Sequence, residues 1–315
     1  MRDIFSEGLL YLDLLEIYGS SYAVADLCGV AQSNVFRGAS ACSKLLNLGL
    51  TKDRAAGTYR IERNHDVQRD LRRLNQRLRG RENGQLRAVG PDYLFPAVLP
   101  RSQAGLLRQL PIRWDDPLQS VDFLERGLLD LVAVNAAALS GRISWPPPVR
   151  RRDLFVPCDG LMVSELSPLP LVLWSAADHT PDLEQLLQQL GADQLFATPC
   201  LAGLQQQPQL ALPAFELLPG TEDLSTTVSA VAQQKQTVYL LSSLHELEPI
   251  LAVEDGPWHP HLLAPVHDSE LLLLTLSSLI AEPLHQQLVS ILRNQARDRL
   301  HSAKSALTSS LRTHQ

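Results

Sequence analysis

Residues 66–81, which read DVQRDLRRLNQRLRGR, limit the choice of fold more than any other stretch of this chain. Their apolar side chains recur at spacings of four, three and four, which places them along one stripe of a helix. That stripe consists of Val67, Leu71, Leu74 and Leu78. The other faces carry arginines that we expect to lie near phosphates, namely Arg69, Arg72, Arg73, Arg77 and Arg79. The pattern predicts a dimerisation helix, with a helix buried in the chain's own core as the alternative.

The preceding segment predicts three short helices and a two-stranded wing. Apolar residues at helical spacing predict helices at 9–17, 22–28 and 32–46. Gly29 permits a tight turn between the second and third helices because glycine adopts left-handed backbone angles at low cost. Residues 50–61 turn at Gly57 and alternate in their apolar positions, as strands do. This arrangement is typical of a winged helix-turn-helix.

The third predicted helix carries the residues suited to reading DNA. Val35, Ala39, Cys42 and Leu46 fall on one face and are expected to pack on the first two helices. The opposite face then holds glutamine, asparagine and arginine, which pair with base edges and phosphates; a merely solvated face is the alternative. With basic residues of this helix and the wing, the DNA-binding candidates are Gln32, Ser33, Asn34, Arg37, Lys44, Arg54 and Arg60.

The charge distribution supports contact between one end of the chain and a polyanion. The whole chain has a net charge of -6. Residues 1–90 carry 14 Lys and Arg against 10 Asp and Glu, a net +4, whereas residues 91–315 carry 14 against 24, a net -10. A basic N-terminal part joined to a larger acidic part favours a nucleic-acid-binding protein over an enzyme or a transport-type binding protein.

From residue 85 onward, short apolar runs alternate with amphipathic helices, which predicts an α/β fold behind an α-dominated N-terminal domain. We expect first-lobe strands at 86–89, 110–114 and 129–134, with helices at 93–107 and 120–126. After the proline-rich residues 145–148, second-lobe strands are expected near Leu161, Leu171, Leu195, Phe215 and Val238, with helices at 183–190 and 224–233. A strand at 271–275 and a helix at 282–300 close the chain. Two such lobes leave a cleft that suits a small molecule.

The domain boundaries follow from these patterns. Residues 1–63 are expected to form the winged helix-turn-helix, residues 64–84 the linker and dimerisation helix, and residues 85–315 the two-lobed domain. The second lobe is expected at about 158–265.

Over nearly its whole length the chain resembles a divergent LysR-type transcriptional regulator. The helix-turn-helix matches at Gly19-Ser20, Ala25, Val30, Gln32 and Arg37, and the wing at Leu50, Arg54, Gly57 and Tyr59. Gly84-Gln85-Leu86-Arg87 resembles the entry into the family's sensor domain, and residues 124–131 a helix-to-strand turn in its first lobe. The sequence departs from the family at Ala31, Phe36, Gly38 and Ser43 and in residues 228–234.

The resemblance implies a winged helix-turn-helix, a linker helix and a two-lobed sensor domain like a type 2 periplasmic binding protein. It implies a homodimer or a dimer of dimers (a homotetramer) on double-stranded DNA, contacts with RNA polymerase, and a small-molecule effector in the cleft. By position, the effector-binding candidates are Pro91, Asp92, Tyr93, Pro117, Gln119, Asn135, Thr198 and Pro199. A divergent regulator without a metabolite ligand, acting through protein–protein contacts, is the alternative.

Other chemistry has little support in the sequence. The cysteines Cys28, Cys42, Cys158 and Cys200 have neither zinc-site nor disulfide spacing, although Cys158 and Cys200 could form a redox pair. His259, His261, His267 and Asp268 could hold a metal, but Pro260 interrupts them, and we expect neither metal nor cofactor. No G-x-S-x-G or phosphate-loop motif occurs, so we expect no enzyme. Charges among the first residues and short apolar runs predict a cytoplasmic protein that does not enter a membrane.

Overall fold

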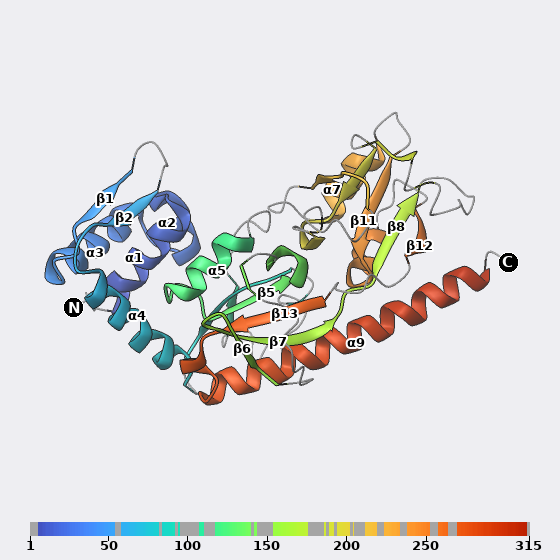
Figure 1. Ribbon diagram of the computed structural model, residues 1–315. Coiled ribbons are helices and arrows are strands. Elements are labelled where there is room, and N and C mark those ends of the chain that lie inside the picture. Colours follow the sequence, from blue (N-terminus) through green and yellow to red (C-terminus); the bar gives the residue numbers. More distant parts are fainter. Residues whose placement is uncertain are drawn as a thin grey trace.

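The computed structural model of the protein describes most of the 315 residues. The described residues are 6–53, 58–81, 84–91, 94, 107–109, 117–139, 142–143, 154–175, 186, 189–191, 194–201, 204, 212–218, 224–233, 238–252, 258–263 and 270–313. Within them, no helix combines the length and the apolar character needed to cross a bilayer. Figure 1 shows the N-terminal helices at one end, a sheet in the middle, a second sheet beyond it, and one long helix running along both sheets.

The N-terminal domain has the predicted winged helix-turn-helix. Its elements are α1 (Ser6–Tyr18), α2 (Ser21–Cys28), α3 (Gln32–Leu45), β1 (Leu50–Lys52) and β2 (Tyr59–Ile61), with the two strands antiparallel. Ser20 caps α2, and Gly29 ends it with a left-handed φ of 62°. The wing turn that we expected at Gly57 lies outside the described residues. Helices α1 and α3 approach closely, because a Cβ on Gly8 would lie 2.6 Å from the Cβ of Cys42.

The linker helix α4 (His65–Arg79) buries a polar face and exposes its apolar stripe. Val67, Leu74 and Leu78 are 39%, 55% and 48% exposed, whereas Leu71 is half-buried against the N-terminal core. The helix buries Gln68, Arg72 and Gln76 instead. It is therefore not a core helix held by its leucines.

The first lobe is built on a six-stranded sheet with the order β4-β3-β5-β13-β7-β6. Its strands are β3 (Leu86–Val89), β4 (Leu107–Gln109), β5 (Leu131–Asn135), β6 (Val156–Cys158), β7 (Leu161–Pro168) and β13 (Glu270–Thr275). Helix α5 (Pro117–Glu125) and the short turn η2 (Ala136–Leu139) flank β5, and η7 (Ser277–Leu279) follows β13. Strands β3, β4 and β5 are parallel and β13 is antiparallel to β5, so the chain returns to this sheet after building the second lobe.

The second lobe is built on a five-stranded sheet with the order β10-β9-β11-β8-β12. Its strands are β8 (Leu171–Ser175), β9 (Leu195–Ala197), β10 (Glu216–Leu217), β11 (Tyr239–Ser243) and β12 (His259–Leu262). The helices are α7 (Leu224–Ala232) and α8 (Leu247–Leu251), with the 3-10 turns η3 (Pro199–Leu201) and η6 (Leu244–Glu246). The 224–233 helix and the strands near Leu195 and Leu171 lie as expected.

Two expectations about the α/β region need correction. The strand expected at Leu161 as the start of the second lobe is β7, which pairs with β13 in the first sheet, so the second sheet begins at Leu171. Leu107 does not end a helix; it begins β4, parallel to Leu86 of β3. Most of the predicted helix 93–107, the predicted strand 110–114, the proline-rich residues 145–148 and most of the predicted helix 183–190 lie outside the described residues.

The last helix, α9 (Pro283–Thr313), extends well beyond the predicted end at residue 300 and contacts both lobes (Figure 1). Its first half buries Leu284, Leu288 and Leu292 in a core shared by residues of both sheets. Its second half buries Leu300 and Leu307 among residues of the second lobe. The helix thus spans the junction between the lobes and is anchored on each side of it.

Shortening a buried leucine of α9 should destabilise the two-lobed domain. Leu288→Ala removes a fully buried side chain from the shared core, and we expect a loss of about 2–5 kcal/mol in the free energy of unfolding. Lys304→Ala, at an exposed position of the same helix, should change it by less than about 0.5 kcal/mol. Urea unfolding of the full chain measures both, and equal midpoints for the two variants would contradict the role assigned to α9.

Candidate functional site

The outward face of α3 is set by how the helix packs. Val35, Ala39 and Cys42 are fully buried against the other N-terminal helices, which turns the opposite side of the helix to solvent. Ser33, Arg37 and Lys44 are exposed on α3. A helix-turn-helix presents this second helix to the major groove. The geometry therefore offers hydroxyl, guanidinium and ammonium donors to a DNA duplex.

Two of the candidate DNA-reading residues on α3 already have partners in the fold. Gln32 is half-buried, and its Nε2 donates to the Ser21 hydroxyl at 2.8 Å, because the start of α2 lies beside the start of α3. Asn34 is half-buried too, and its Oδ1 accepts from the Arg37 guanidinium at 2.9 Å. We expected Gln32 and Asn34 to point away from the core, and the structure shows in addition that each is hydrogen-bonded within the helix-turn-helix. Gln32 links the start of α3 to the start of α2, and Asn34 orients the Arg37 guanidinium.

The wing adds further cationic side chains to the N-terminal domain. Arg60 on β2 is exposed, and its guanidinium Nη2 lies 3.5 Å from Oδ2 of Asp53. The Lys52 ammonium lies 5.4 Å from the centre of the Tyr59 ring. Arg54, also a candidate, lies outside the described residues. Ser43 of α3, a departure from the family pattern, is buried and accepts from the Leu50 N–H at 3.1 Å. It joins the helix to the wing and has no exposed surface for DNA.

A buried ion network joins the N-terminal domain to the first lobe. The Asp13 carboxylate of α1 accepts from Arg72 Nε of α4 at 2.9 Å and from the Arg87 guanidinium of β3 at 2.8 Å. All three side chains are buried. Burial alone raises the pKa of Asp13, but the two arginines outweigh it and hold this pKa below its ordinary value. The charged network is therefore the stable form.

A second buried carboxylate continues the network into the lobe. Asp130 accepts both Nε and Nη2 of Arg79 at 2.7 Å, and the Arg87 backbone N–H at 2.8 Å. Gln76 of α4 donates to the Leu129 carbonyl at 2.8 Å. One face of α4 is thus bonded to α1 and to the turn before β5. The expectation that the α4 arginines lie near phosphates is wrong for Arg72 and Arg79, because both neutralise buried carboxylates.

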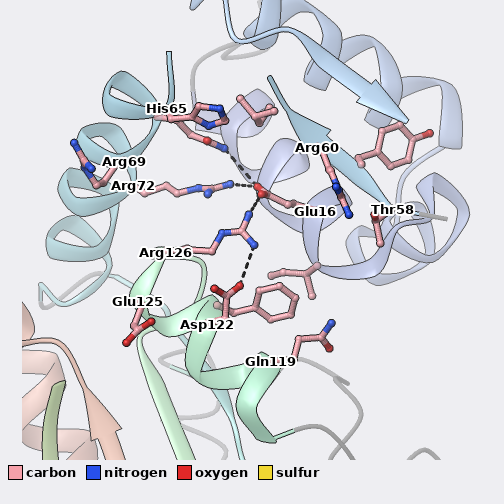
Figure 2. A pocket seen from close by; sticks show the side chains of 15 residues that line it. Glu16, Thr58, Arg60, His65, Arg69, Arg72, Gln119, Asp122, Glu125 and Arg126 are labelled. Atoms are coloured by element: carbon pink, nitrogen blue, oxygen red, sulfur yellow. Dashed lines mark hydrogen bonds and ion pairs between the residues drawn. The ribbon is translucent and has the colours of Figure 1, made fainter. Parts of the chain in front are cut away.

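Beside this network lies a groove of about 630 Å³ between the wing, α1, α4 and α5. Figure 2 shows Glu16 at its centre, where Arg72 and Arg126 converge on one carboxylate, with Asp122 paired to Arg126. Its volume is in the range of ligand sites. Its walls alternate arginines and carboxylates that mostly pair with one another, so the groove presents no single charge to a ligand. Sequence patterns did not reveal it, since its residues come from four separate elements.

The described effector candidates do not gather at a single site. Pro91, Pro117, Asn135 and Pro199 lie together around a small hollow between the lobes, with a volume of about 10 Å³. Gln119 lines the groove of Figure 2 instead, since α5 turns it toward the wing. Thr198 is fully buried and donates to Glu246 at 2.7 Å. Asp92 and Tyr93 lie outside the described residues.

Asn135 contributes an amide side chain to this hollow. It is 2% exposed, and its Oδ1 accepts from the Ala137 N–H at 3.0 Å. Within the described part of the chain, its Nδ2 has no hydrogen-bond partner. An unsatisfied buried donor costs free energy, so the position suits a hydrogen-bond acceptor supplied by water or a ligand.

The cysteines and histidines show little sign of chemistry. Cys158 and Cys200 are free thiols, and the Cys200 thiol donates to Glu246 at 3.0 Å. Burial and the Glu246 carboxylate raise the pKa of Cys200 well above its ordinary value, which disfavours the reactive thiolate. His261 hydrogen-bonds to Ser175 at 3.0 Å, whereas His267 and Asp268 lie outside the described residues. The described ranges contain no group of three metal-ligating side chains.

Sequence reasoning assigned no partner to Asp13 or Arg87, although each left a signal. Asp13 stands with Glu16 inside the otherwise apolar run LLYLDLLEIY, and Arg87 stands within the buried strand LRAV. A charge inside an apolar run needs a charged partner from another element. That reasoning predicts a partner for each, but only the fold identifies it.

Removing the Asp13 charge should destabilise the folded protein by an amount that depends on pH. Asp13→Asn removes the buried carboxylate that neutralises Arg72 and Arg87. We expect the free energy of unfolding to fall by about 3–5 kcal/mol at pH 7. Because the folded-state pKa of Asp13 is lowered, its contribution is present above the unfolded value near 4 and is lost as the pH falls below it. The wild-type advantage over Asp13→Asn should therefore shrink in acid.

Urea unfolding at a series of pH values checks this expectation. Asp70→Asn, at an exposed position of α4, is the matched control and should behave like wild type. An Asp13→Asn variant as stable as Asp70→Asn at pH 7 would show that the network does not support the fold.

The chain matches no protein-family model and no curated protein sequence. Among solved structures, a full-length OxyR variant from Pseudomonas aeruginosa has a TM-score of 0.50 and 14% identity, covering 92% of this chain and 94% of its own. The probable transcriptional regulator PA0477 from Pseudomonas aeruginosa has a TM-score of 0.50 and 16% identity, covering 91% and 95%. CbnR, a LysR family transcriptional regulator, has a TM-score of 0.42 and 14% identity, covering 92% and 98%.

At this level of identity, the first two likenesses establish the fold, and they extend over nearly the whole of each chain. They confirm the predicted fold class, an α-dominated winged helix-turn-helix domain followed by a linker helix and a two-lobed α/β domain. The chain therefore has the fold of the full-length OxyR variant and of PA0477.

Proposed function

We propose that the protein is a LysR-type regulator of transcription that binds double-stranded DNA in a sequence-specific manner. The observation that carries the proposal is the face of α3, where Arg37 is exposed and oriented by Asn34 within a winged helix-turn-helix. The net +4 of residues 1–90 provides the matching electrostatic attraction for phosphates. PA0477, which shares the fold, is named a probable transcriptional regulator, which supports a regulator rather than an enzyme.

The exposed stripe of α4 supports a homodimer. Val67, Leu74 and Leu78 are apolar, lie on one side of one helix, and are exposed in the single chain. Such a stripe suits the same stripe of a second copy, because a two-fold pair buries both. Pairing two linker helices also pairs two recognition helices, which fits an imperfect palindrome. A dimer of dimers and a contact with RNA polymerase remain predictions from the family resemblance.

The chemistry and the size of the hollow at Asn135 give opposite indications about effector binding. Its unpartnered Nδ2 donor favours a small effector with an acceptor group such as a carbonyl or carboxylate. A volume of about 10 Å³ holds one water at most, so an effector requires the lobes to separate. Because α9 is anchored in both lobes, that separation is opposed. This second observation favours the alternative, a regulator that responds through protein–protein contacts.

Arg37→Ala should weaken specific DNA binding. Losing one arginine contact to a base or phosphate should reduce affinity by about 5- to 150-fold, and wild-type binding should weaken steeply with added salt. Mobility-shift titration on duplexes that the wild type selects from a random library measures both effects. Arg297→Ala, an exposed arginine of α9 far along the chain, is the control. Unchanged affinity in Arg37→Ala would reject the assignment of α3.

Leu74→Glu should break the dimer. A carboxylate in the middle of the stripe would be buried without a partner in the paired state, which costs several kcal/mol. Light scattering of the full chain should then report a monomer. Arg73→Glu, which is exposed beside the stripe and off its apolar positions, introduces the same side chain and should leave the dimer intact. A dimer that persists in Leu74→Glu would show that the main contact lies elsewhere.

A further inference from the structure

We propose that Phe36 reads the C5-methyl group of a thymine in the operator. This inference rests on the proposed function and adds a base preference to it. Phe36 is one of the sites where the sequence departs from the pattern of the family that it resembles. An apolar ring on a base-reading helix recognises the thymine methyl group, which the other three bases lack.

The exposure of Phe36 is unusual for an aromatic residue of this chain. Phe36 is 50% exposed and Tyr22 is 73% exposed, and every other described phenylalanine, tyrosine or tryptophan is buried or half-buried. Both exposed rings belong to the helix-turn-helix, on α2 and α3. Exposing a large apolar ring gives up the free energy of burying it, unless a partner covers the ring in the functional complex.

The surroundings of Phe36 suit a single methyl group better than a broad apolar partner. The residues three and four positions before it on the helix are Ser33 and Gln32, and Ser40 lies one turn after it. The other exposed apolar residue of α3, Leu45, is nine positions away, on the opposite side of the helix. Phe36 is thus an isolated apolar group within a polar stripe.

The backbone holds this ring in a defined place. Val35 and Ala39 on either side of it are fully buried. The intervening Gly38 lets α3 approach α1, since a Cβ there would lie 2.8 Å from the Tyr11 ring. Arg37, next in the chain, is held by Asn34 at 2.9 Å. A guanidinium suited to guanine or phosphate therefore lies beside a ring suited to thymine, so a thymine is expected near the Arg37 contact.

Deoxyuridine tests the proposal because it removes only the methyl group and leaves the hydrogen-bonding edges of the base unchanged. In duplexes selected by the wild-type protein, each thymine is replaced singly by deoxyuridine, and affinity is measured by mobility shift. Loss of one buried methyl contact should weaken wild-type binding about fourfold at one position of each half-site. Phe36→Ala should bind the thymine and uracil duplexes equally.

Two further variants keep the result interpretable. Phe36→Leu retains an apolar side chain and should keep part of the preference for thymine, even if Phe36→Ala folds poorly. Tyr22→Ala removes the other exposed ring and should keep the full preference. Discrimination that survives in Phe36→Ala, or that is absent at every thymine while wild-type binding stays specific and salt-sensitive, would overturn the inference and leave the proposed function standing. A wild-type protein that selects no sequence would overturn both.

Discussion

Two buried carboxylates, Asp13 and Asp130, determine how the parts of this protein are joined. Each is fully buried, and a buried charge is tolerated only with excellent pairing. Their partners, Arg72, Arg79 and Arg87, come from the linker helix and the first strand of the α/β domain. Because no pair lies within one element, the network can form only when α1, α4 and β3 are together. The N-terminal domain is therefore joined to the first lobe through buried ion pairs.

The buried polar face of α4 and its exposed apolar stripe therefore have different roles. The buried face holds the ion network, so the apolar stripe is left outside, where a second copy of the chain can cover it. A helix that used its leucines internally would have no such surface. The same helix thus connects the N-terminal domain, the first lobe and the surface proposed for the dimer. At the far end of the molecule, α9 packs against both lobes and so joins them to each other.

The candidate DNA interface was predictable in outline. The periodicity of Val35, Ala39 and Cys42 correctly placed the buried side of α3, and thereby its outward side. Periodicity could not show that Gln32 bonds to Ser21, or that Asn34 holds Arg37, because those contacts depend on where α2 lies. The positions of the effector candidates likewise could not be predicted from periodicity. Four gather at one hollow, while Gln119 faces a different groove because α5 turns it away.

Local patterns in the chain were sufficient for the three N-terminal helices, the wing, most of the strands and the apolar stripe, because each depends on residues close in sequence. Tertiary structure alone decided which arginines of α4 are buried, that β7 belongs to the first sheet, and that α9 reaches across both lobes. An arginine looks the same in sequence whether it faces a phosphate or a buried aspartate. Its role is set by the free energy of a charge in its final surroundings, which only the assembled fold supplies.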